Sequence, residues 1–380
     1  MTPRSSGRPT MASPGNPVMT RILLISNAVM HYRVGVYNEF ARRFKERGFE
    51  FIVRANRLQK QNPYPVAFDF REVPFRLSLY RREIRDLRPD VVILFLHIKD
   101  VILFPLLYWL RLSRRPVLIW TKGANLDAPR NRIRRALFHH MQTLADGLIL
   151  YSPNETRFVK RKNRSKITYA NNTINYLEFP EIAASREEIK AEYGIPFRKT
   201  ALFVGRMEVG GGRKKVDHAI KVFNTIENPD YGLVLVGSGF GEGLRKEIRR
   251  DNVIYLGEIH DPGNVGICKI FKMADIFLIP GHVGLGLNQA FFLGLPVITE
   301  KGPQPPEIHY LVPGRNGFLV EENDVDDLKA KVVFLLDNDQ ARAEFAANAK
   351  RDILKNASLE GMFGGFLQNI ERVRERRSSA

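Results

Sequence analysis

Short apolar runs that end in small or polar residues recur along this chain and alternate with helical stretches. Runs of this length, without a polar face, are typical of strands buried on both faces of a parallel sheet. In the first half they cover residues 21–26, 49–53, 90–96, 116–120 and 147–151, with helical periodicity at 36–47 and 130–144. Since strand and helix alternate, we predict a doubly wound α/β domain over residues 21–178.

The same alternation restarts near residue 199. Apolar runs cover residues 200–204, 232–236, 252–256, 275–279 and 295–299, and helical stretches cover 216–226, 244–250, 287–293 and 324–336. A chain of 380 residues is long enough for two domains, at roughly 150 residues each. We therefore expect a second doubly wound domain over residues 199–355, joined to the first by a polar linker over 179–198.

The two ends of the chain differ in character. Residues 1–20 are rich in Pro, Gly, Ser and Thr and contain arginines but no apolar core, which predicts a disordered tail and not a signal peptide. Within residues 356–380, apolar side chains recur at steps of three and four: Leu359, Met362, Phe363, Phe366, Leu367 and Ile370. This spacing predicts an amphipathic terminal helix, which we expect to pack back on the first domain.

The net charge of +18 is confined to the first half of the chain. Residues 1–190 hold 34 Lys and Arg against 16 Asp and Glu, whereas residues 191–380 hold 25 of each. A basic domain attracts nucleic acid, acidic lipid headgroups or a phosphorylated substrate. The apolar stretch 101–110, followed by Arg111, Arg114 and Arg115, suits docking at an anionic membrane surface. A crossover helix packed on the sheet explains that stretch equally well.

The cysteine count bears on the compartment. The single cysteine, Cys268, excludes an intramolecular disulfide and fits a reducing compartment. No apolar run reaches the ~18 residues expected of a membrane-spanning helix. We therefore expect a cytoplasmic protein, with peripheral docking on the inner face of the membrane as a hypothesis.

The first strand of the predicted second domain ends in Gly205 and Arg206, and a glycine-rich loop then delivers Lys214 to the start of the next helix. Ligands of open parallel sheets bind at the carboxyl ends of the strands. An arginine fork, a lysine point charge and the N–H groups of a helix N-terminus together form a good diphosphate site. The alternative is a solvated basic loop.

Further small or polar residues follow the other strands of this domain. Glycine lets a ligand approach the backbone closely, and N–H groups at a helix start favour anions. The donor-binding candidates at the strand ends are Gly205, Gly237, Gly239, Glu258, Ile259, Val283, Gly284, Leu285, Gln289 and Glu307. Ordinary turns explain Gly237, Gly239, Glu258 and Ile259 equally well.

In order and spacing, the motifs at 203–206, 214–217, 236–239, 294–298, 306–308 and 316–320 resemble those of the retaining GT-B glycosyltransferases of family 4. The resemblance covers about residues 200–340 of the chain. It implies two Rossmann-like domains that face a cleft, of which the second binds a nucleoside diphosphate sugar. It also implies that Arg206 and Lys214 neutralise the leaving diphosphate, so that neither a bound metal nor another cofactor is required.

The sequence departs from this family in one motif, where two glutamates usually stand eight residues apart. Those positions are Gly281 and Gln289 here. The amide of Gln289 can still bond to ribose hydroxyls. The loss of both carboxylates leaves the identity of the sugar open, and an inactive protein is an alternative.

In the first domain, Lys122 follows the fourth strand, where family members often carry a histidine. A catalytic or acceptor-binding role for Lys122 and a solvent-exposed loop lysine are equal alternatives. We expect the loop 27–33 after the first strand to place His31 and Arg33 on the acceptor side of the cleft. Arg33 is the stronger candidate, because an unpaired arginine suits an anionic partner.

The resemblance thus implies a metal-independent hexosyl- or related transferase. It would move a sugar from a nucleoside diphosphate sugar to a glycan or lipid-linked acceptor, with retention, in cell-surface polysaccharide or glycolipid synthesis. One alternative is a nucleotide-sugar epimerase of the same fold. Another, suggested by charge alone, is a nucleic-acid-binding protein, although the sequence contains no recognised nucleic-acid motif.

Overall fold

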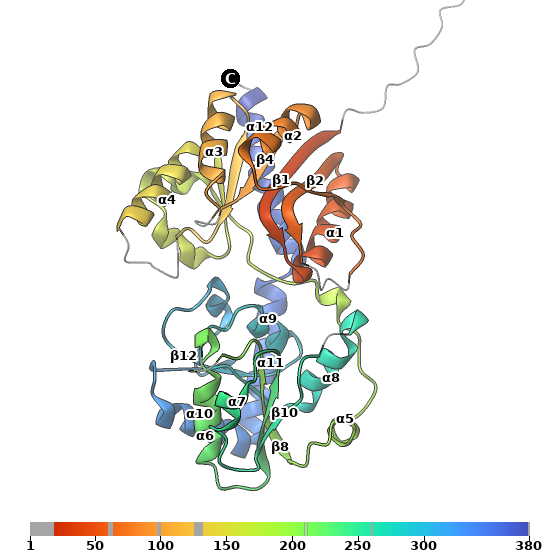
Figure 1. Ribbon diagram of the computed structural model, residues 1–380, viewed down its shortest axis with the longest axis vertical. Coiled ribbons are helices and arrows are strands. Elements are labelled where there is room, and N and C mark those ends of the chain that lie inside the picture. The colour runs from red at the N-terminus through yellow and green to blue at the C-terminus, as the bar shows by residue number, and fades with distance from the viewer. Residues whose placement is uncertain are drawn as a thin grey trace, which may run out of the picture.

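The computed structural model describes residues 19–59, 64–96, 100–124, 132–208, 210, 212–259 and 261–378. Figure 1 shows two domains one above the other: the first is coloured mainly from red to yellow, with the blue terminal helix beside it, and the second from green to blue. Each is built on a parallel sheet flanked by helices, which confirms the predicted pair of doubly wound α/β domains. Residues 1–18 of the predicted tail lie outside the described residues.

The first domain contains a seven-stranded sheet in the order β3-β2-β1-β4-β5-β6-β7, in which neighbouring strands are parallel. The strands are β1 (Thr20–Val29), β2 (Phe49–Leu58), β3 (Asp69–Glu72), β4 (Val91–Phe95), β5 (Val117–Thr121), β6 (Gly147–Leu150) and β7 (Ile167–Tyr169). Helices on both faces bury side chains such as Leu23, Ile93 and Ile119 completely. The five predicted strands are predominantly apolar because helices cover most of the sheet on both faces.

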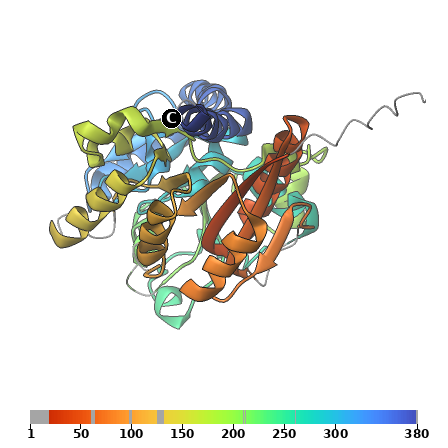
Figure 2. The ribbon, with the colours of Figure 1, turned by 90° about the horizontal axis from the view of Figure 1, so that it is seen from above.

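Helices form a layer on each face of this sheet. Helix α1 (His31–Glu46) and the terminal helix α12 (Leu359–Ser378) cover one face. Helices α2 (Leu77–Leu87), α3 (Leu103–Leu112) and α4 (Arg132–Leu144) cover the other. Figure 2 shows the sheet between α12, in dark blue, and the orange helices of the opposite layer.

The second domain contains a six-stranded parallel sheet in the order β10-β9-β8-β11-β12-β13. The strands are β8 (Lys199–Val204), β9 (Tyr231–Val236), β10 (Val253–Tyr255), β11 (Ile276–Leu278), β12 (Val297–Glu300) and β13 (Gly317–Val320). The helices are α5 (Arg186–Glu192), α6 (Val216–Asn224), α7 (Glu242–Arg245), α8 (Val265–Met273), α9 (Leu285–Phe292), α10 (Val325–Asp337) and α11 (Asp339–Asn356). One hydrophobic core joins these elements.

Six short 3-10 helices complete the described secondary structure. They are η1 (Pro153–Phe158), η2 (Arg161–Lys166), η3 (Tyr176–Glu178), η4 (Gly212–Lys214), η5 (Pro262–Asn264) and η6 (Pro306–Tyr310). None of the described helices is long and apolar enough to cross a membrane.

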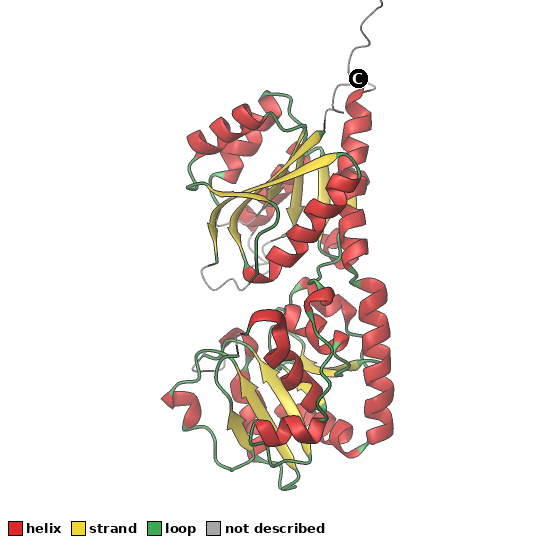
Figure 3. Cartoon of the chain, turned by 90° about the vertical axis from the view of Figure 1, so that its right-hand side faces the viewer, coloured by secondary structure: helices red, strands yellow, loops and turns green. Residues whose placement is uncertain are grey.

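The chain crosses between the domains twice, and the two crossings lie against each other. The first crossing follows β7, and the second joins α11 to α12. The Asn171 amide donates a hydrogen bond of 2.7 Å to the Asn356 carbonyl, and the Thr173 hydroxyl donates to the Ala357 carbonyl. Helix α12 then packs beside the first sheet, as predicted, with Phe363 and Phe366 fully or almost fully buried against α1 (Figure 3).

Some elements differ from the prediction for identifiable reasons. The strand β3 was not predicted because it is a polar, largely exposed edge strand, and β7 was not predicted because it has three residues. The predicted loop at 27–33 is wrong: β1 continues to Val29 and α1 begins at His31. In the segment predicted as a linker, α5 packs with α8, and Ile189 and Phe197 lie in the second core.

The apolar stretch 101–110 belongs to the first core. Leu103, Leu106, Leu107 and Leu110 of α3 are fully buried against the sheet. The structure therefore favours the crossover helix over membrane docking for the buried face of this stretch.

Two adjacent glycines of α12 provide a matched test of how closely this terminal helix packs on β7. A Cβ on Gly365 would lie 2.0 Å from the Tyr169 carbonyl oxygen, whereas a Cβ on Gly364 meets nothing within 4 Å. We predict that Gly365→Ala lowers the free energy of unfolding by about 1–3 kcal/mol. Gly364→Ala should raise it by about 0.5–1 kcal/mol, because alanine favours the helix. Urea unfolding followed by circular dichroism would measure both, and equal effects would contradict the close packing of α12 on β7.

Candidate active site

A cavity of about 300 Å³ lies between the two domains. The first domain and its crossing segment contribute His31, Tyr32, Arg33, Phe95, Lys122, Tyr151, Asn172 and Ile174, and the second domain contributes His282, Gly284, Leu285, Gln289, Pro305 and Glu307. The cavity thus brings together predicted residues of both domains: His31, Arg33, Lys122, Gly284, Leu285, Gln289 and Glu307. Because it combines cations, aromatic rings and a helix start in one enclosed space, we take it as the candidate active site.

The start of helix α9 forms part of the second-domain wall. Gly284 precedes the helix with φ 57° and ψ −156°, a conformation that is open essentially to glycine alone. Gly284 and Leu285 both line the cavity. The first N–H groups of a helix have no partner within the helix, and its dipole favours a negative charge there. This wall therefore suits an anionic group.

Lys214 lies behind this wall with its side chain folded over Gly205. A Cβ on Gly205 would lie 2.5 Å from the Lys214 Cδ and Cε atoms, so only glycine leaves room for the lysine. The Lys214 ammonium donates to the His282 carbonyl at 3.3 Å. Burial, followed by the nearby Arg213, lowers the pKa of Lys214 to about 8, although Glu307 acts in the opposite direction. Arg206 follows Gly205 directly and is exposed, and it does not line the cavity.

Gly281 and His282 pair with the backbone of the glycine-rich loop. The Gly281 and His282 N–H groups donate to the carbonyls of Lys214 and Arg213, at 3.0 and 2.8 Å. A Cβ on Gly281 would lie 2.2 Å from the Arg213 carbonyl oxygen. No larger side chain fits at position 281 in this arrangement, so Gly281 is what allows the two backbone segments to approach this closely.

His282 lines the cavity and was not predicted as a site residue. Burial and the charges of Arg213, Lys214 and Lys122 lower its pKa to about 3. The imidazole is therefore neutral at physiological pH, and its surroundings are strongly positive. The approach of Lys122 from the other domain carries no sequence signal, so the positive surroundings of His282 could not have been predicted, although its neighbours Val283 and Gly284 were candidates.

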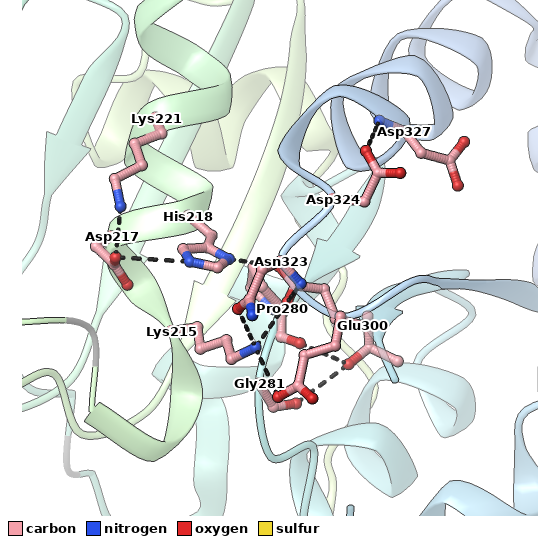
Figure 4. Close-up of polar contacts among 12 residues, drawn as sticks. Lys215, Asp217, His218, Lys221, Pro280, Gly281, Glu300, Asn323, Asp324 and Asp327 are labelled. Carbon is pink, nitrogen blue, oxygen red and sulfur yellow. Dashed lines mark hydrogen bonds and ion pairs between the residues drawn. The ribbon is translucent and has the colours of Figure 1, made fainter. Parts of the chain in front are cut away.

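Lys215 does not line the cavity, and it anchors the loop through the contacts that Figure 4 shows. Its ammonium donates to Glu300 at 2.8 Å and to the Asn323 side chain at 2.9 Å. The fully buried Glu300 also contacts the His218 ring at 2.5 Å. Lys215 has a φ of 51°, and the side chain of its neighbour Lys214 lies over Gly205. Glu300 therefore fixes the loop that presents Lys214.

Several predicted donor-binding residues do not line the cavity. A Cβ on Gly237 or Gly239 would lie 2.2 or 2.0 Å from the carbonyl oxygen of Gly205 or Met207, so these glycines allow two strand ends to approach each other. Val283 is fully buried, and its N–H donates to the Gln304 side chain at 3.2 Å. Glu258 is exposed, and Ile259 packs against the second core.

Asn172 connects the two walls of the cavity and was also not predicted. Its side-chain oxygen accepts from the Arg33 guanidinium, and its amide donates to Glu307. Its carbonyl oxygen accepts from Tyr310 at 2.9 Å and from Asn288 at 3.1 Å. One residue of the crossing segment thus links α1 of the first domain to α9 and η6 of the second.

Among the described residues, no group of three or more His, Cys, Asp and Glu side chains could hold a metal ion.

Glu155 provides a pH-dependent test of the contact between η1 and η6. It is buried in η1, and one of its carboxyl oxygens has no hydrogen-bond partner among the described residues. Burial raises the pKa of Glu155 to about 7; a hydrogen bond with Ser152 opposes this, and the charge of Glu307 adds to it. The native state therefore binds more protons than the unfolded state between about pH 4.5 and 7, so this group lowers stability as the pH rises through that range.

We predict that Glu155→Gln stabilises the protein by about 1–3 kcal/mol at pH 8 and has little effect at pH 4.5. Thermal unfolding at both pH values would measure this, with the exposed Glu187→Gln as the control. The same pH dependence in Glu155→Gln and the parent protein would show that this carboxyl is not the group that titrates.

Residues 185–352 match the family model described as glycosyl transferases group 1. An uncharacterized glycosyltransferase of Methanocaldococcus jannaschii is 25% identical over 205 residues, which cover 52% of this chain and 51% of that protein. Spore coat protein SA of Bacillus subtilis is 22% identical over 238 residues, which cover 58% of this chain and 62% of that protein. The chain thus spans about half to three fifths of the length of these two relatives.

Solved structures match over nearly the whole chain. HepE of Anabaena in complex with UDP gives a TM-score of 0.73 at 15% identity and covers 95% of this chain and 100% of that chain. Sucrose-phosphate synthase of Thermosynechococcus elongatus gives 0.70 at 17% identity, with the same coverage. The chain therefore has the GT-B fold of these proteins, and the sequence matches support a glycosyltransferase of the group 1 type.

Proposed function

We propose that this protein transfers a sugar from a nucleoside diphosphate sugar to a glycan or lipid-linked acceptor. The observation that carries the proposal is the cavity between the domains, where the start of α9 lies beside the loop that holds Lys214. HepE, a neighbour in fold, was solved with UDP and with UDP-glucose, which supports this kind of donor. Retention of anomeric configuration and metal independence are part of the proposal through the family resemblance.

Positive groups at this wall would act on the leaving group. As the bond between sugar and diphosphate breaks, negative charge grows on the diphosphate. Fixed cations and helix N–H groups stabilise that charge more strongly in the transition state than in the ground state. Lys214 and the start of α9 would supply this stabilisation, and the exposed Arg206 would close over the diphosphate from the strand end.

The other cavity residues would orient the substrates. Gln289 would bond to ribose hydroxyls, and Glu307 would accept from hydroxyl groups of the donor. Lys122, opposite His282, would contact the transferred sugar or the acceptor. The comparisons favour neither the epimerase nor the nucleic-acid-binding alternative. Neighbours named for lipopolysaccharide biosynthesis and for poly(ribitol-phosphate) modification support cell-surface polysaccharide or glycolipid synthesis.

The donor site can be tested by ligand-induced stabilisation. We predict that UDP or another nucleoside diphosphate raises the melting temperature, and that Lys214→Ala or Arg206→Ala weakens its binding about 10–100-fold, as expected for a charge-assisted contact. The exposed Lys246→Ala is the matched control. If no nucleotide or nucleotide sugar shifts the melting temperature, the donor-site assignment fails.

The lowered pKa of Lys214 adds a pH dependence to this test. Above about pH 8 the free protein loses the Lys214 proton, so binding of a diphosphate then requires proton uptake and becomes weaker. Lys214→Arg keeps its charge and should remove this dependence.

We further propose that the first domain docks on an anionic membrane through helix α4 and η2. Residues 101–170 hold 14 Lys and Arg against 3 Asp and Glu. The first turns of α4 are exposed on all sides and combine Arg132 and Arg135 with Ile133, which is 82% exposed. The Asn163 amide of η2 donates to Thr143 at 3.0 Å, which places Arg161, Lys162 and Arg164 beside the C-terminal end of α4. Cations interleaved with exposed apolar side chains suit a lipid interface.

Flotation with vesicles tests this surface. We predict binding at low salt to phosphatidylglycerol-containing vesicles, and a loss of about tenfold or more in the double variant Arg132→Gln/Arg135→Gln, since each basic residue contributes about 1 kcal/mol near such a surface. Arg245→Gln/Lys246→Gln in the second domain is the control. Absence of binding at low salt would rule out the docking surface.

A further inference from the structure

Arg33 is a buried cation without an anionic partner. The residue is 6% exposed, and no carboxylate of the described residues lies within ion-pair distance of it. Its guanidinium donates to the neutral Asn172 side chain and makes a long contact of 4.0 Å with the Met362 sulfur. A guanidinium offers five N–H donors, and a charge removed from water is costly unless it is paired. Glu307 reaches the guanidinium only through the Asn172 side chain, so among the described residues Arg33 has no direct anionic contact and can accept one.

Aromatic rings surround the guanidinium on its protein side. Its central carbon lies 4.9 Å from the Trp120 ring centre, 5.4 Å from that of Tyr32 and 5.9 Å from that of Tyr151. Although burial lowers the pKa of Arg33, the tyrosines and Glu307 outweigh that effect, so the group stays charged. Cation–π contacts of this kind contribute about 0.5–2 kcal/mol each and explain how the charge is tolerated. These ring contacts do not use the N–H groups of the guanidinium, of which one donates to Asn172 and another makes the long contact with Met362.

A second cation lies in the same cavity. The Lys122 ammonium is 5.9 Å from the centre of the Tyr151 ring, the same distance as Arg33. Lys122 follows β5 and Arg33 lies in the first turn of α1, so both cations belong to the first domain. The one carboxylate of the cavity wall, Glu307, belongs to the second domain and bonds to Asn172. The first-domain wall therefore carries two positive charges and no negative one among its described residues.

We propose that this wall binds a phosphate group of the acceptor, with Arg33 and Lys122 as its two cationic contacts. The inference rests on the proposed function and deepens it by naming the chemical class of the acceptor. A phosphate carries up to two charges and three acceptor oxygens, which match a planar guanidinium fork together with a point charge. An uncharged sugar hydroxyl in the same place would leave both cations unpaired.

The donor diphosphate is the competing occupant of these cations, so the experiment must fill the donor site first. The full chain, saturated with UDP, is titrated calorimetrically with inorganic phosphate, with a short-chain phosphatidic acid and with glucuronate. We expect phosphate and phosphatidic acid to bind, and glucuronate to bind about tenfold more weakly. Tighter binding of phosphatidic acid than of phosphate identifies a lipid-borne group, and equal binding identifies a phosphate on a glycan or polymer.

Two variants assign the binding to these residues. Lys122 lies on a half-buried loop. The variant Lys122→Gln should bind phosphate about tenfold more weakly than the parent protein and should bind UDP equally well. Arg33→Lys keeps the positive charge but loses the planar guanidinium, and it should also weaken phosphate binding about tenfold. The exposed Lys160→Gln is the control and should bind phosphate like the parent.

Three results would overturn the proposal: no phosphate binding to the UDP-bound protein, glucuronate binding as tight as phosphate, or equal losses in Lys122→Gln and Lys160→Gln. Absence of UDP binding would instead contradict the donor site. In that case phosphate would be titrated into the nucleotide-free parent protein and into nucleotide-free Lys122→Gln. Weaker binding by the variant would support the acceptor proposal, and equal binding would contradict it.

Discussion

The two crossings between the domains are hydrogen-bonded to each other, and the rest of the molecule depends on this contact. It holds the start of α12 beside the crossing segment, from which α12 can lie along the first sheet with Phe363 and Phe366 buried. The same segment carries Asn172 into the cavity, where it meets residues of both domains. The contact between the crossings thus lies directly beside the residue that joins the two walls of the cavity.

The cavity has an uneven distribution of charge. Lys122 and Arg33 lie on one wall, the Lys214 ammonium lies behind the other, and Glu307 is the carboxylate among the lining residues. Each cation has a different kind of neighbour. Arg33 packs against aromatic rings, the Lys214 side chain packs against Gly205, and the Lys122 ammonium lies near the Tyr151 ring. Such an arrangement is stable without ligands because neutral partners solvate each charge, and it keeps its capacity to bind anions.

The strands were predictable where the sheet is covered on both sides, since burial on both faces requires continuous apolar runs. The edge strand β3 has no such requirement and carries the sequence Asp69-Phe-Arg-Glu72. In the site, Lys214 and Gly284 were found because the glycine-rich loop and the helix start are local features of the chain. His282 lies beside the predicted Val283 and Gly284, but its partners, like those of Asn172 and Glu300, meet it only in the folded protein. Gly237 and Gly239 were predicted to contact the donor, but they allow two strand ends to approach each other. A glycine that makes room for a ligand cannot be distinguished in the sequence from one that makes room for another part of the backbone.

The close backbone pairing at Gly281 also restricts how this protein can change. A glutamate at this position cannot be gained by one substitution, because its Cβ would collide with the Arg213 carbonyl before the carboxylate reached any ligand. The loop before α6 would have to move first, and Glu300 holds that loop through Lys215. Any new preference for a sugar is therefore more accessible through Gln289 or through the first-domain wall than through position 281.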